Sequence, residues 1–168
     1  MAESDGRLPS ETVPFQTVQI IVAALISGTL IFAVIAIFTA QPGNLDLVAY
    51  LAVGFSAVEL AISFVVPKIV TRKAMHELPS ENGEIPAMAL FGVYQTQAII
   101  HGALLEGPAF FCCIAYMNTQ LWWTLATALG LMAILAILFP TRGRFDDWVR
   151  EQRELRSLDA PPDASRAT

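Results

Sequence analysis

Four apolar stretches dominate this sequence, and each has the length of a membrane span. They cover residues 18–39, 45–66, 94–117 and 121–139, about 19 to 24 residues each. An α-helix needs about 20 apolar residues to cross a hydrocarbon core of about 30 Å. The stretches are apolar on every face and lack the alternation of a membrane β-strand, so each is expected to be a helix that satisfies its own backbone hydrogen bonds. The sequence therefore predicts an all-α protein that crosses a membrane four times.

Composition excludes several other classes of protein. Of the 168 residues, 55% are hydrophobic and only 15% are charged, whereas about 25% are charged in an ordinary soluble domain. The formal net charge is −5, and no basic stripe stands free of acidic residues, so no nucleic-acid partner is expected. A soluble enzyme, a disordered protein and a disulfide-stapled secreted domain are excluded as well. The lipid bilayer is the expected surrounding.

The positions of lysine and arginine predict the orientation. All 10 of them lie in the two ends of the chain and in the connection between the second and third stretches, and the turns at 41–46 and 118–120 hold none. Because cytoplasmic segments hold the excess of basic residues, both termini are predicted to face the cytoplasm, as an even number of crossings requires. The first stretch is longer than a signal-peptide core and follows no cationic cluster, so it is expected to be retained. We therefore expect a multi-pass protein of the cell inner (cytoplasmic) membrane.

The lengths of the connections predict the topology. Very short turns join the first stretch to the second and the third to the fourth, so a domain at 17–140 is expected to be a polytopic four-helix bundle of two antiparallel hairpins. The connection between the hairpins should extend both flanking helices, over 68–78 past a kink at Pro67 and over 86–95. A cluster of turn-forming residues at 80–83 predicts a break between these extensions.

The chain changes character after the fourth stretch. Apolar residues recur at helical spacing within residues 141–158, which predicts a short amphipathic cytoplasmic helix. Its apolar edge is expected on lipid headgroups or against the connection between the hairpins, and a solvated helical stub is the alternative. The two ends, 1–16 and 159–168, have the composition of disordered cytoplasmic tails.

One face of the third stretch carries the strongest candidate site. Glu106 lies near its centre, where an ionisable side chain costs about 2.5 to 3.5 kcal/mol to insert. At about 100° per residue, Gln95, Gly102, Ala109 and Cys113 fall on the same face of the helix. Small residues allow membrane helices to approach closely, so this face is expected to point into the protein or toward another copy of the chain.

Pro108 adds a second polar group to this site. It has no amide hydrogen for the carbonyl of Leu104 and is expected to kink the helix, which leaves a free acceptor within one turn of Glu106. Two interpretations stay open. Either Glu106 binds an ion or a proton, or its protonated carboxyl is a hydrogen-bonding link between helices.

Two further polar side chains are expected at one depth in the cytoplasmic half of the membrane. Glu59 lies in the second stretch on a face with Ser56 and Ser63, and His101 lies in the third stretch. By the helical rise per residue, Glu59 and His101 should be level, so a hydrogen bond between them is expected if their helices are neighbours. Such a pair is either a proton relay or a structural clasp.

No pattern in the sequence predicts a cofactor, a metal or a catalytic centre. A haem needs axial ligands from facing helices, and only one of the histidines, His101, lies in a span. Cys112 and Cys113 are adjacent in an apolar helix, where thiols are packing groups, and they match no metal-ligand spacing. Without a phosphate loop, a nucleophile motif or an acid–base pair, the chain is expected not to be an enzyme.

Residues 91–111, FGVYQTQAIIHGALLEGPAFF, resemble the signature of uncharacterised four-span membrane proteins of bacteria. That family implies no activity. The second and third stretches also resemble, in outline, the rotor-ring proteolipid of rotary ATP synthases, a helical hairpin with a polar cytoplasmic loop and an essential carboxylate in its second helix. This resemblance gives Glu106 the place of the carboxylate. The sequence departs from that family in its two extra helices and in having a single glycine, Gly54, in the second stretch.

Together these features predict a non-enzymatic membrane protein. The expected role is interaction or assembly within the bilayer, through the face with Gly102 and Ala109, with a second copy of the chain or another membrane protein as partner. The alternative is a proton- or cation-coupled translocation element that uses Glu106, with Glu59 and His101 as accessory groups.

Overall fold

The computed structural model describes residues 12–43, 46–78 and 86–159, and these form five α-helices and no strand. The helices are α1 (Thr12–Thr39), α2 (Asp46–Glu77), α3 (Ala87–Thr119), α4 (Trp122–Ile137) and α5 (Arg142–Asp159). The prediction of an all-α fold is confirmed for this part of the chain. The predicted break at 80–83 and most of both predicted tails lie outside the described residues.

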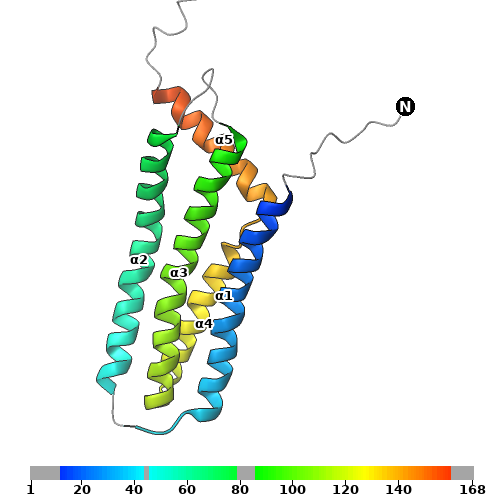
Figure 1. The fold of residues 1–168 in the computed structure, drawn as a ribbon. Helices are drawn as coiled ribbons and strands as arrows, with labels where there is room; N and C mark the ends of the chain where they lie inside the picture. The colour runs from blue at the N-terminus through cyan, green and yellow to red at the C-terminus, as the bar shows by residue number, and fades with distance from the viewer. Residues whose placement is uncertain (1–11, 44–45, 79–85, 160–168) are drawn as a thin grey trace, which may run out of the picture.

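The helices α1 to α4 lie side by side, with α3 in the middle (Figure 1). α3 packs against α1, α2 and α4, while α4 also contacts α1 and α2. The turns that join α1 to α2 and α3 to α4 lie at one end of the molecule, and α5 crosses the opposite end. We call these the turn end and the α5 end.

Three of the helices are long and apolar enough to cross a membrane by themselves, namely Phe15–Thr39, Asp46–Glu77 and Met88–Thr119. α4 has 16 residues, which rise about 24 Å and fall short of a hydrocarbon core of about 30 Å. It is joined to α5 through a bend of 72°, and the number of candidate spans is four only if this bent pair counts as one. The structure therefore shows three to four candidate spans, as a multi-pass membrane protein has.

The long helices extend beyond the apolar stretches at the α5 end. α2 continues through Pro67 to Glu77, and α3 begins at Ala87, so the predicted extensions are helical. α1 begins at Thr12, and the prediction of a disordered tail is wrong for residues 12–16. Pro14 lies in the first turn of α1, where backbone amides have no acceptor within the helix, so its missing amide hydrogen costs no helical hydrogen bond.

Side-chain size is distributed as expected for a protein surrounded by lipid. The buried positions of α2 include Ala49, Ala52, Ser56 and Ser63, which let α2 and α3 approach closely. Large apolar side chains point outward instead, and the ring of Phe38 is 83% exposed. In water such a surface would be unfavourable over its whole area, so its exposure supports a hydrocarbon environment.

Hydrogen bonds join the two connections at the turn end. The backbone amide of Gln41 donates to the carbonyl of Met117 at 3.0 Å, and Gln120 Nε2 donates to the carbonyl of Ala40 at 2.9 Å. Gln120 takes a left-handed conformation with φ of 56°, which ends α3 and aims its side chain across to the other turn. These bonds join the residues that follow α1 to the end of α3.

An aromatic cluster anchors α5 to the rest of the molecule. The ring of Phe145 lies 6.4 Å from Phe15 of α1, 5.8 Å from Phe91 and 5.2 Å from Tyr94 of α3, and Trp148 lies 5.6 Å from Tyr94. The apolar edge of α5 therefore packs on the ends of α1 and α3. Phe91 and Tyr94 belong to segment 86–95, which the sequence assigns to the connection between the hairpins.

Candidate functional site

Two small residues of the third apolar stretch, Gly102 and Ala109, lie inside the molecule. Ala109 is fully buried. A Cβ added to Gly102 would lie 3.0 Å from Leu25 Cδ1 of α1 and 4.0 Å from Leu135 Cδ1 of α4. The face that carries Gly102 and Ala109 is thus used for contacts between α3 and its own neighbours α1 and α4.

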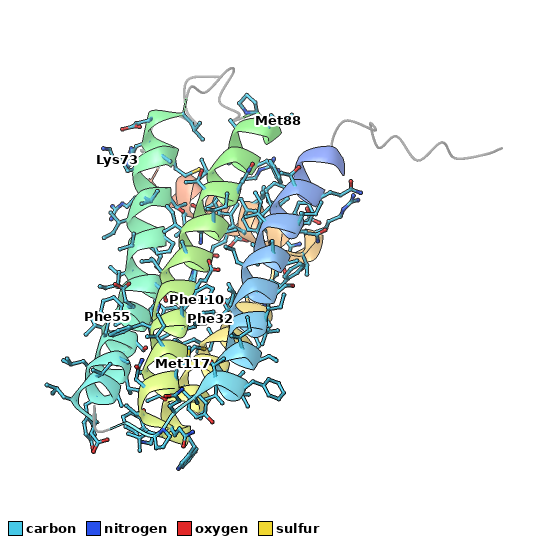
Figure 2. The ribbon with its side chains drawn as sticks, turned by 60° about the horizontal axis from the view of Figure 1, so that its bottom comes forward. Phe32, Phe55, Lys73, Met88, Phe110 and Met117 are labelled. Carbon is cyan, nitrogen blue, oxygen red and sulfur yellow. The ribbon has the colours of Figure 1, made fainter. Side chains whose placement is uncertain are left out.

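Glu106 lies where α3 meets α1, near the middle of the helix. Its neighbour one turn along α3 is Phe110, whose ring lies 5.1 Å from Phe32 of α1 (Figure 2). One turn in the other direction is Gly102, which faces Leu25 of α1. The carboxyl of Glu106 is half-buried at this α1/α3 seam, and no hydrogen bond or ion pair to it is found in the described part of the chain.

Glu59 occupies the corresponding position where α2 meets α3. One turn along α2 is Phe55, whose ring lies 6.1 Å from Phe111 of α3. The next residue of α2, Ser56, has its Oγ 3.1 Å from Cys112 Sγ. Because α2 and α3 run in opposite directions, these contacts set Glu59 level with Gly107, at the α2/α3 seam. Within the residues that the structure describes, its half-buried carboxyl also has no partner.

The two glutamates therefore lie at one depth, on the two sides of an exposed strip of α3. We define the α3 strip as Thr96, Ala103 and Gly107, which are exposed on the side of α3 between its contacts with α1 and α2. A Cβ on Gly107 would meet nothing within 4 Å. Both glutamates stand out in the sequence, but their relative depth depends on the α2–α3 register, which the contact between Phe55 and Phe111 shows.

The structure does not join His101 to Glu59. The ring of His101 lies 5.8 Å from the ring of Phe64 on α2 in an edge-to-face contact. Phe64 is five residues after Glu59, so His101 and Glu59 are about 7.5 Å apart along the axis of α2. His101 Nε2 is buried and has no hydrogen-bond partner among the described residues. The expected relay or clasp between these two side chains is absent from this part of the structure.

Other polar contacts between α2 and α3 were not predicted. Thr71 Oγ1 donates a hydrogen bond to Gln97 Oε1 at 3.1 Å. The predicted site residue Gln95 lies two positions earlier, is half-buried and is on the side of α3 that faces α1. The contact of Cys112 with Ser56 is likewise new, because the thiol was expected only to fill space. Helical spacing would have found Gln97, since it precedes His101 by one turn on the side of α3 that faces α2.

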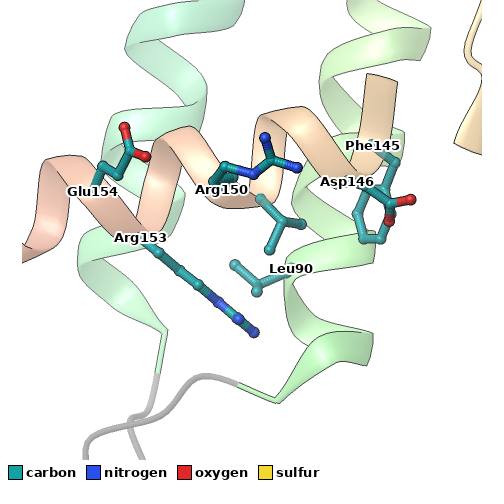
Figure 3. Close-up of a pocket in the computed structure, with 7 residues that line it drawn as sticks. Leu90, Phe145, Asp146, Arg150, Arg153 and Glu154 are labelled. Carbon is teal, nitrogen blue, oxygen red and sulfur yellow. The ribbon is translucent and has the colours of Figure 1, made fainter. Parts of the chain in front are cut away.

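A groove of about 580 Å³ lies at the α5 end, between α5 and the first turns of α3 (Figure 3). In the view of Figure 3, Leu90 lies between the side chains of Arg150 and Arg153. Its lining residues are Leu90, Phe145, Asp146, Val149, Arg150, Arg153 and Glu154. Two guanidinium groups and two carboxylates balance each other here, and Arg150 pairs with Asp147 at 3.7 Å, so the groove offers no net charge to an ionic ligand.

The chemistry available near the α3 strip is that of two isolated carboxyl groups in an apolar surface. No three His, Cys, Asp or Glu side chains of the described residues lie together as a metal centre would require. A neutral carboxyl both donates and accepts hydrogen bonds, so each glutamate can bind a polar group from another helix or exchange a proton. Comparison of the chain with protein-family models, with curated proteins and with solved structures found no match.

Proposed function

We propose that this chain is a multi-pass protein of the cell inner membrane, a four-helix bundle of two antiparallel hairpins with both termini in the cytoplasm. The support is the position of its basic residues. Every lysine and arginine in the described ranges lies in the half of α2 near the α5 end or in α5 itself: Lys68, Arg72, Lys73, Arg142, Arg144, Arg150, Arg153 and Arg156. Cytoplasmic segments hold such an excess, so the α5 end is the cytoplasmic one.

We propose further that the protein acts as an interaction or assembly component within the bilayer. The observation that carries this proposal is the α3 strip with Glu59 and Glu106 beside it. A carboxyl at mid-membrane costs about 2.5 to 3.5 kcal/mol to insert, and neither carboxyl finds a partner in the described part of its own chain. A helix from a second copy, or from another membrane protein, would approach closely over Ala103 and Gly107 and supply polar partners to both glutamates.

Disulfide cross-linking tests this surface. In a background with Cys112→Ala and Cys113→Ala, a cysteine at Ala103 is expected to cross-link to a second polypeptide in membranes. Ala133 is the matched control, because it is also a small exposed residue, but it lies on α4. Equal cross-linking from Ala103→Cys and Ala133→Cys, or none from Ala103→Cys, would contradict the assembly surface.

A second candidate function is proton- or cation-coupled translocation through Glu106. The specific observation in its favour is that Glu59 supplies a second carboxyl at the same depth. Glu106→Gln separates the two functions, because glutamine keeps the hydrogen-bonding capacity but cannot titrate. Assembly predicts that cross-linking from Ala103→Cys survives Glu106→Gln and that proton uptake into liposomes does not change. Translocation predicts that proton uptake is lost.

A further inference from the structure

The imidazole of His101 has an unexplained buried nitrogen. Nε2 is inaccessible and has no hydrogen-bond partner among the described residues, while the ring contacts Phe64 of α2 edge-on. A buried polar atom in a membrane protein has no bulk water to bind, so leaving it unpaired is unfavourable. A partner within reach on α2 would remove this penalty.

α2 has a matching backbone group at the same level. Pro67 lies inside α2, fully buried, and its ring nitrogen carries no hydrogen for the carbonyl of Ser63 four residues earlier. Ser63 is itself buried, and its hydroxyl donates to the carbonyl of Leu60 at 2.8 Å, so this hydroxyl is committed elsewhere. The carbonyl of Ser63 therefore has lost its helical donor within the α2/α3 seam.

The contacts between the helices fix how α2 and α3 are aligned near this position. Phe64 touches His101 on the side nearer the turn end, and Thr71 bonds Gln97 on the side nearer the α5 end. Carbonyl groups of α2 point toward its C-terminus, and side chains of α3 tilt toward its N-terminus. Both directions are toward the α5 end, so the Ser63 carbonyl points from one residue before Phe64 toward the level of the imidazole.

We propose that one internal water molecule binds between His101 and Ser63. Nε2–H of the imidazole donates to the water oxygen, and the water donates to the Ser63 carbonyl. Buried waters bind where protein polar groups lack direct partners, and ordered water is one of the ways in which membrane helices satisfy a carbonyl freed by proline. The site is a link between α2 and α3 and does not depend on the proposed assembly role.

Nuclear magnetic resonance of the imidazole tests the site. The full chain carries two histidines, so His76→Gln in lipid nanodiscs leaves a single labelled ring. The expected result is a hydrogen on Nε2 and a magnetisation-transfer signal from water to that hydrogen. Pro67→Ala supplies an amide hydrogen to the Ser63 carbonyl, and the transfer signal is expected to fall about fivefold, as the loss of one net hydrogen bond predicts.

Pro108→Ala is the matched control. It also removes a buried proline from a helix interior. The new amide hydrogen at position 108 can bond the carbonyl of Leu104 on α3, and the Ser63 carbonyl stays free. The water signal is expected to survive it. A ring with no hydrogen on Nε2, a direct coupling from Nε2–H to the Ser63 carbonyl, or a signal that Pro108→Ala removes and Pro67→Ala does not would each overturn the proposal.

Discussion

Gly43 lies at a close approach between the residues that follow α1 and the end of α3. A Cβ at this position would collide with the backbone carbonyl of Asn118 in the last turn of α3. Backbone cannot move aside as the end of a flexible side chain can. The close approach at Gly43 is what allows the amide of Gln41 to bond the carbonyl of Met117.

We therefore expect Gly43→Ala to destabilise the protein. Forcing the two turns apart should cost about 1 to 3 kcal/mol, seen as a lower midpoint of thermal unfolding in detergent. Gly130→Ala is the control, because a Cβ on this α4 glycine meets nothing within 4 Å. That change should be neutral or stabilising by up to about 1 kcal/mol through helix propensity. Equal midpoints for the two variants would contradict the role given to Gly43.

At the same scale, the sequence identified most of the polar side chains but not their partners. Glu59, Glu106 and His101 stand out in apolar stretches, because each is costly in lipid. Which of them share a level depends on the α2–α3 register, and that register is set by contacts such as the one between Ser56 and Cys112. Spacing along one helix carries no information about the register between two helices. The sequence therefore predicts that Glu59 lies at the depth of His101, whereas the structure sets it at the depth of Glu106.

Among the elements, the long helices were predictable and the junction of α4 and α5 was not. Length and hydropathy predict α1, α2 and α3 because each must cross a fixed thickness of hydrocarbon. α4 is shorter than its apolar stretch, since Leu121 is extended and the helix ends at Ile137, before Pro140. The 72° bend that follows directs α5 across the ends of α1 and α3. Tertiary contacts of Phe145 and Trp148 contribute to that direction, as does the hydrogen bond from Gln19 Nε2 to the Pro140 carbonyl at 3.0 Å.

Phe145→Ala is expected to release α5. The ring contacts Phe15, Phe91 and Tyr94, and truncating a half-buried phenylalanine should cost about 2 kcal/mol. Local opening of α5 should then raise its amide hydrogen exchange about 30-fold, with little change in α3. Leu155→Ala is the control, because Leu155 is 50% exposed on the same helix. Unchanged exchange in α5 would show that the aromatic cluster does not hold it.

On the scale of the whole molecule, the two ends differ in charge and in construction. The turn end is closed by hydrogen bonds between its two connections and has no lysine or arginine among its described residues. The α5 end holds the basic side chains and is covered by an amphipathic helix. The proposed orientation keeps the guanidinium groups of Arg142 and Arg144 in the cytoplasm, because moving them across hydrocarbon would be far more costly than moving turns that hold no lysine or arginine.

This asymmetry predicts which end an impermeant reagent can reach. With both native cysteines replaced by alanine, Asn118→Cys places a thiol at the turn end and Arg153→Cys places one at the α5 end, both at exposed positions. A membrane-impermeant maleimide added to intact cells or spheroplasts should label Asn118→Cys, and should label Arg153→Cys only after permeabilisation. Each variant is the control for the other, since both are labelled once detergent is added. Labelling of both thiols in intact spheroplasts would mean that the α1–α4 helices do not separate the two ends by a membrane. Labelling of Arg153→Cys alone would mean that the orientation is reversed and that the basic end does not determine it.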